Sequence, residues 1–251
     1  MRGWRLVCLG LGCALGCTGP ANTLTPGFEG APGLKRFLVC APNTVISLSA
    51  ELQPATAMLR DQIDAYLRFH ERESQTLGLL ECRKLWTESM AAAKEQNALE
   101  RTPAFFARKL DEVYDFDAIV MPSLIVTQAR AMNGSARWDG VERQIGIAKG
   151  TSSDRTERRI RRDPMEKQVL STRTSGEFPV TSVHVLVFSA AGERIFEGRG
   201  GIEFVQQVDL SNFARKHAVE FRLRDDLPGG IDAVREGIAI GFSPLLPMPE
   251  E

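Results

Sequence analysis

Four segments of the chain have a hydrophobic residue at every third or fourth position, which is the pattern of an amphipathic helix. A fifth segment, 83–99, is rich in alanine and also predicts a helix. Pro54 and the pair Thr102-Pro103 stand at helix starts, where the missing N–H of proline costs nothing. Ser211 and Gly230 begin the last two segments, and Ser211 can cap its helix. The pattern predicts helices at residues 55–72, 83–99, 103–114, 211–221 and 230–242.

Short apolar runs and alternating runs predict strands between these helices. The most apolar run, 116–126, predicts a central strand in which Pro122 marks a bulge or the strand end, because proline cannot donate to a sheet. Turn residues at 133–135 and 190–193 predict antiparallel hairpins. The other predicted strands are 35–40, 77–81, 180–188, 194–198 and 202–208.

Strands and helices alternate early in the chain, and hairpins follow late. This order predicts an α/β fold with a single mixed sheet and helices packed on it. We assign residues 35–247 to one domain, because a chain of 251 residues can bury one sizeable core. Residues 149–179 carry charge without periodicity and predict an exposed loop.

The first residues have the pattern of an export signal. Arg2 and Arg5 are followed by a short apolar run at 6–15 and by small residues, which together predict a signal peptide over 1–16. The run is shorter than the roughly 20 apolar residues that span a bilayer. Residues 18–34 are rich in glycine, proline and threonine and predict a flexible tether.

Ala14-Leu15-Gly16-Cys17 resembles the bacterial lipobox, in which the cysteine is lipidated and becomes the mature N-terminus. Ala14 stands where that motif prefers leucine, and Cys13 is a second candidate with a shorter apolar core before it. The resemblance implies a lipid anchor on Cys17. An ordinary signal peptide with incidental cysteines is the alternative. In the lipoproteins of enteric bacteria, aspartate directly after the lipidated cysteine retains the protein in the inner membrane. Thr18 stands at that position here, so the resemblance implies the outer membrane.

Cleavage before Cys17 leaves two cysteines without an assigned role, Cys40 and Cys82. In an exported protein such a pair can be oxidised to a disulfide, which would stabilise the fold by ~4 kcal/mol on the chain-entropy model. Two separate buried thiols are the alternative, because free cysteine packs as a small hydrophobic residue. The sequence leaves both interpretations open.

No catalytic, cofactor or metal motif stands out. The histidines, at 70, 184 and 217, have no metal-ligand spacing and lie beside apolar positions, so we expect structural roles for them.

Asp115, Asp117 and Asp139 could form an acid–base set, but turn and cap roles are commoner for aspartate at such positions. The arginines between 155 and 162 could contact an anionic surface, or they belong to a solvated loop. A formal net charge of −1 and the lack of interleaved aromatic residues there argue against nucleic acid.

The order of features resembles bacterial envelope lipoproteins of the curli-secretion-channel and penicillin-binding-protein-activator classes. The shared features are the lipobox, a strand ending in Pro-Asn at 39–43, the strand at 116–120, a hairpin at 191–193 and a last helix ending in Pro-x-x-Pro at 244–247. The hairpin has Ala191 where those families often have aspartate. The resemblance implies a compact α/β body that serves in envelope assembly without catalysis.

We therefore expect a lipid-anchored, non-enzymatic envelope lipoprotein that binds a protein partner or self-associates. An exported hydrolase acting on envelope polymers is one alternative, with a site assembled from residues distant in sequence. A subunit of an oligomeric envelope channel is another.

Overall fold

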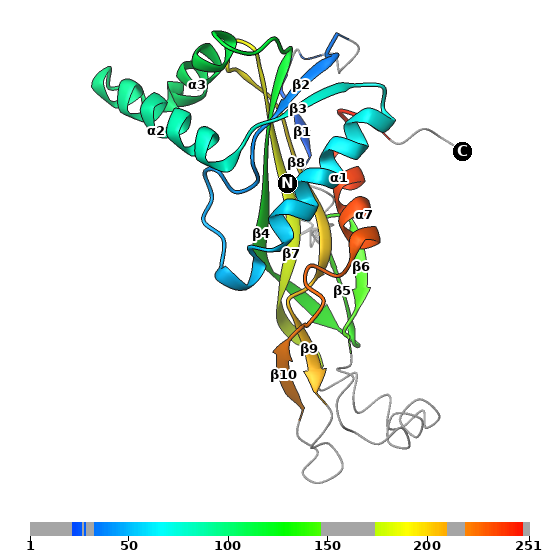
Figure 1. The fold of residues 1–251 in the computed structure, drawn as a ribbon. Helices are drawn as coiled ribbons and strands as arrows, with labels where there is room; N and C mark the ends of the chain where they lie inside the picture. Colours follow the sequence, from blue (N-terminus) through cyan, green and yellow to red (C-terminus); the bar gives the residue numbers. More distant parts are fainter. Residues whose placement is uncertain (1–21, 27, 29–32, 147–173, 210–218, 248–251) are drawn as a thin grey trace, which may run out of the picture.

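The computed structural model describes residues 22–26, 28, 33–146, 174–209 and 219–247. Within these ranges helices pack on a large mixed sheet, which confirms the predicted α/β class (Figure 1). The main path of the sheet has the order β1-β8-β7-β4-β2-β3, with the hairpin β5–β6 attached to β4; β9 and β10 form a separate pair. The strands are β1 (Thr23–Leu24), β2 (Arg36–Val39), β3 (Glu73–Thr76), β4 (Ala118–Met132), β5 (Ser135–Trp138), β6 (Val141–Gln144), β7 (Gly176–Ser189), β8 (Arg194–Phe204), β9 (Gln206–Asp209) and β10 (Glu220–Leu223). The helices are α1 (Ala55–Phe69), α2 (Leu79–Glu95), α3 (Thr102–Asp111) and α7 (Ile231–Phe242), with 3-10 turns at Ala50–Leu52 and Leu99–Arg101.

The sheet is parallel in its early strands and antiparallel in its late ones. β2 lies parallel to both β3 and β4, whereas β4 and β7 pair antiparallel from Ala118 opposite Ser189 to Ala131 opposite Gly176. Parallel pairing requires a crossover, and α1 supplies it between β2 and β3. The change from parallel to antiparallel follows the change from strand–helix alternation to hairpins in the sequence.

Helices cover both faces of the sheet. Successive β4 residues point to opposite faces, so Val120 packs in the core beneath α1 and α7, and Ile119 packs in the core beneath α2 and α3. Leu59 and Ile63 of α1 are fully buried in the first core, as Phe106 and Leu110 of α3 are in the second. The stripe predicted for α1 is the face that it buries. The stripe predicted for α3 holds at Phe106 and Leu110 but not at Val113, because α3 ends at Asp111 and Val113 is 73% exposed.

Glycines let α7 lie unusually close to β8. A Cβ on Gly200 would lie 1.8 Å from the carbonyl oxygen of Gly237, and a Cβ on Gly198 would lie 2.1 Å from that of Gly241. No heavy atom tolerates such a distance, so only glycine permits this backbone-to-backbone approach. The sequence predicted α7, with Val234, Ile238 and Phe242 buried, but not how closely it packs.

Several predicted elements lie elsewhere in the structure. The predicted strand at 77–81 is wrong: β3 precedes it, and α2 already begins at Leu79. Phe221 belongs to β10, which pairs with β9, rather than to a helix from Ser211; residues 210–218 lie outside the described ones. The four residues at 176–179 of the predicted charged loop belong to β7, and residues 147–173 lie outside the description.

Pro122 lies inside β4, not at its end, and pairs with Val185 of β7. Its nitrogen points toward the side where β2 has already ended, because the last residue paired between β2 and β4 is Val120. The Pro122 carbonyl on that side accepts the N–H of Asn43 at 3.0 Å. A missing donor is harmless at this point, so the strand continues.

Candidate functional site

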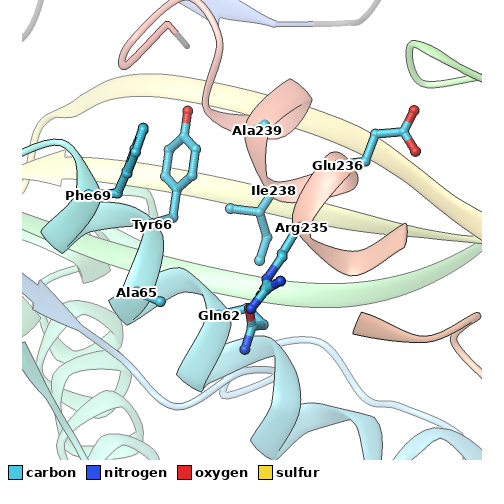
Figure 2. A pocket seen from close by; sticks show the side chains of 8 residues that line it. All are labelled: Gln62, Ala65, Tyr66, Phe69, Arg235, Glu236, Ile238 and Ala239. Atoms are coloured by element: carbon cyan, nitrogen blue, oxygen red, sulfur yellow. Dashed lines mark hydrogen bonds between the residues drawn. The ribbon is translucent and has the colours of Figure 1, made fainter. Parts of the chain in front are cut away.

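An apolar groove runs between α1 and α7 on the outer surface of the molecule (Figure 2). We call it the α1–α7 groove, and its volume is about 370 Å³. Phe69, at the end of α1, borders it with 60% of its surface exposed. The lining residues are Gln62, Ala65, Tyr66 and Phe69 from α1, and Arg235, Glu236, Ile238 and Ala239 from α7.

Contacts at both ends of the groove hold the two helices in place. The Tyr66 hydroxyl donates to the Leu246 carbonyl at 2.6 Å, and its ring lies 5.4 Å from that of Phe242. At the other end, Arg235 Nε donates to Gln62 Oε1 at 2.8 Å. Burial raises the pKa of Tyr66 to about 12, so this hydroxyl remains a neutral donor. The small side chains of Ala65 and Ala239 also line the groove and leave space between the helices unfilled.

The chemistry of the groove suits binding better than bond cleavage. Its eight lining residues include no cysteine, serine, threonine or histidine, and its one hydroxyl already has a partner. Glu236 is paired with Arg143 at 2.5 Å. An apolar surface with a charged rim recognises an apolar ligand or surface.

Asn22 fastens the N-terminal stretch to the C-terminal end of α7. Its Nδ2 donates to the carbonyls of Ile240 at 2.6 Å and Ser243 at 2.5 Å, while its Oδ1 accepts the Arg199 N–H at 2.8 Å. Carbonyls at the end of a helix lack the usual helical donors, and Asn22 gives a further donor to Ile240, which also accepts the Ser243 N–H, and one to Ser243, the residue after the helix. We call these three bonds the Asn22 clamp.

The clamp and β1 modify the predicted tether over residues 18–34. Thr23 and Leu24 pair with Glu197 and Phe196 of β8, so the chain joins the sheet within that stretch. Cys17 itself lies outside the described residues. The residues around Asn22 in the sequence do not predict these hydrogen bonds, because its partners are more than 170 residues away in the chain.

Cys40 and Cys82 come together in the second core. Cys40 follows β2, Cys82 lies in the first turn of α2, and both are free, fully buried thiols. The Ala41 N–H donates to Cys82 Sγ at 3.3 Å. A hydrogen bond between the two thiols, together with burial, raises the pKa of Cys40. Proximity satisfies the first requirement for a disulfide, which stays one of the two interpretations that the sequence left open.

A polar row crosses β4, β7 and β8 on the α2–α3 side of the sheet. Ser123 is directly opposite His184, whose Nε2 lies 3.1 Å from a Glu197 carboxylate oxygen. Arg194 donates to the other Glu197 oxygen at 2.8 Å. Ser123 and His184 are only 6% and 8% exposed, so this arrangement offers no open face to a substrate. The structural role expected for His184 fits its carboxylate partner.

The other histidines are separate from this row. His70 follows α1, with its ring 4.5 Å from that of Tyr66. Burial, and then the nearby Arg72, lower the pKa of His70. His217 lies outside the described residues, as do the arginines between 155 and 162.

The three aspartates do not form an acid–base set. Asp117 joins the starts of β2 and β4, since its Oδ2 accepts the N–H groups of Lys35 and Arg36, each at 2.9 Å. The Arg36 guanidinium pairs with Asp117 and Asp115, and its hydrogen bond is the main cause that lowers the pKa of Asp117 to about 2. Asp139 instead accepts the Ser182 hydroxyl at 2.7 Å.

Across the described ranges, no three His, Cys, Asp or Glu side chains gather as metal ligands. No helix among the described residues is long and apolar enough to cross a membrane.

Comparisons with known proteins give little further information. No protein-family model matches the chain. No curated protein matches it either. Among solved structures, the chain is similar to a dodecamer of a PelC point variant from Paraburkholderia phytofirmans, with 11% identity, 91% of this chain and 99% of that chain covered, and a TM-score of 0.36. A likeness at this level carries no argument about fold or function.

Proposed function

We propose that this protein is a lipid-anchored, non-enzymatic lipoprotein of the bacterial cell envelope with a binding or assembly role. The observation that carries the proposal is the export signal at 1–16, which ends at the lipobox-like cysteine Cys17. The α1–α7 groove supports a binding role, because its lining is apolar and its polar groups are already paired. Because Thr18 follows the cysteine, we place the anchor in the outer membrane.

The anchor of the proposed form is strong enough to be permanent. Lipidation of this kind attaches three acyl chains to the cysteine, and each buried methylene contributes about 0.8 kcal/mol of membrane affinity. A single acyl chain holds a protein only marginally. A mature protein with this modification therefore stays with the membrane through washing in high salt.

Intact-mass measurement of the membrane-extracted protein tests the proposal. We expect a mature chain that begins at Cys17 and carries three acyl chains. Cys17→Ser should abolish the modification, and the matched variant Cys13→Ser should retain it. A soluble mature chain cleaved elsewhere, or an acylated chain that begins at Cys13, would contradict the assignment.

A further inference from the structure

We propose that the α1–α7 groove lies against the membrane in which Cys17 is anchored. The inference rests on the proposed lipid anchor and adds to it the orientation of the body. It commits to one occupant of the groove, the surface of the lipid bilayer.

The length of chain between the anchor and the fold limits how far the body can lie from the bilayer. Cys17 and Asn22 are five residues apart, so a fully extended chain spans at most ~18 Å between them. The Asn22 clamp fixes the end of this stretch on the carbonyls of Ile240 and Ser243. The body cannot move away from the bilayer by more than this span.

The groove lies close to the clamp because both use α7. Ile238 and Ala239 line the groove and directly precede Ile240, whose carbonyl the clamp binds. A helix with its side chains is about 10–12 Å across, so the part of the groove that Ile238 and Ala239 line is within about one helix diameter of the clamp. The short tether therefore keeps the groove within reach of the lipid surface.

The chemistry of the groove matches the boundary between headgroups and acyl chains. Phe69 offers an exposed aromatic ring, and Ala65 and Ala239 continue the apolar surface beside it. Arg235 lines it, and Arg68 directly precedes Phe69. Both guanidinium groups are mostly exposed, Arg68 beside Asp64 at 3.0 Å and Arg235 beside Asp232 at 3.6 Å. Aromatic and apolar groups insert at this boundary, while long arginine side chains keep their charged ends, with their acidic partners, in the polar headgroup layer.

Photocrosslinking of the full-length lipidated protein in vesicles of phosphatidylethanolamine and phosphatidylglycerol tests the orientation. In one variant, Phe69 is replaced by p-benzoylphenylalanine. In the control, the same replacement is made at Val113, which is 73% exposed just beyond α3 on the other side of the sheet. We expect phospholipid adducts at position 69 and none at position 113. A third variant with p-benzoylphenylalanine at Ala65, an exposed residue that also lines the groove, should form adducts too, which guards against a local defect at position 69.

A longer tether provides a second arm. A Gly/Ser insertion of about 20 residues between Cys17 and Asn22 adds a coil of about 25 Å and should reduce adducts at position 69. Equal adducts at 69 and 113, or crosslinks from 69 to protein instead of lipid, would overturn the orientation. The intact mass of the same sample separates the two proposals: an unmodified Cys17 overturns both, and a modified Cys17 without lipid adducts overturns the orientation alone.

Discussion

The two sides of the sheet are covered by helices in different ways. On the α2–α3 side, large side chains fill the interface, as where the rings of Trp86 and Phe106 meet edge to face at 5.4 Å. On the α1–α7 side, α7 reaches the sheet through backbone contacts at its glycines. The space between α1 and α7 stays open, because lining residues such as Ala65 and Ala239 have side chains too small to fill it.

This difference separates a side whose interface is filled by side chains from a side with an open groove. Tight backbone contact fixes α7 on β8, while the surface between the helices stays open. The buried cysteine pair lies on the filled side, whereas the Asn22 clamp binds the end of α7 on the side with the groove. Changes on the two sides should therefore have different consequences for stability.

The largest effect concerns the cysteine pair on the filled side. In protein isolated from an oxidising compartment, we expect Cys40 and Cys82 to form a disulfide that stabilises the fold by ~4 kcal/mol, less any strain. Thiol titration in denaturant should then find neither thiol before reduction and both afterwards. Detection of both thiols before reduction would show a reduced pair and remove this difference between the sides.

The second effect concerns close contact at α7. Gly200→Ala places a Cβ 1.8 Å from the Gly237 carbonyl oxygen and should cost about 3 kcal/mol, because the helix must shift away from the sheet. The matched control is Gly78→Ala before α2, where nothing lies within 4 Å of the added Cβ and the cost should stay below about 1 kcal/mol. Urea unfolding measures both. Equal losses would contradict the account of how α7 packs.

The third effect concerns the Asn22 clamp. Asn22→Ala removes three hydrogen bonds and leaves the Ile240 and Ser243 carbonyls without this donor, which should cost about 1–2 kcal/mol. Thr23→Ala, at the exposed neighbouring position, should cost little. Thermal unfolding of the two variants compares them. An unchanged Tm for Asn22→Ala would mean that the clamp does not hold the N-terminal stretch.

The smallest effect concerns Asp117 and depends on pH. The pKa of this carboxyl is lowered from its ordinary 3.8 to about 2, so its contribution is complete above pH 3.8 and is lost as the pH falls toward 2. Because Asp117 is partly exposed, we expect Asp117→Asn to cost only about 1 kcal/mol at neutral pH. The variant should lose less stability than the wild type between pH 4 and pH 2. Asp115→Asn, at a largely exposed carboxyl, should follow the wild-type curve.

The parts of the fold that the sequence predicted depend on local pattern. The buried faces of α1 and α3 follow their own apolar spacing, as Ile63 and Phe106 show. The missed parts depend on distant partners. β10 is a strand because it pairs with β9, and β1 is a strand because it pairs with β8. The residues within β1 and β10 do not by themselves predict these pairings.

The candidate site was missed for the same reason. Phe69 and Ala239 belong to helices that the sequence predicted, but only the packing of α1 on α7 brings them to one groove. The sequence left open whether Cys40 and Cys82 lie together, because a count of cysteines carries no distance, and the fold brings the two thiols into contact. Cys17 still rests on its sequence motif.

Hydroxyl-radical footprinting on vesicles tests the central claim most directly. It compares the lipidated protein on vesicles with the unlipidated Cys17→Ser protein in solution, at Phe69 beside the groove and at Met90, an exposed residue of α2. We expect membrane anchoring to protect Phe69 from oxidation and to leave Met90 unchanged. Protection of Met90 instead, or of neither residue, would contradict the claim that the α1–α7 side faces the membrane.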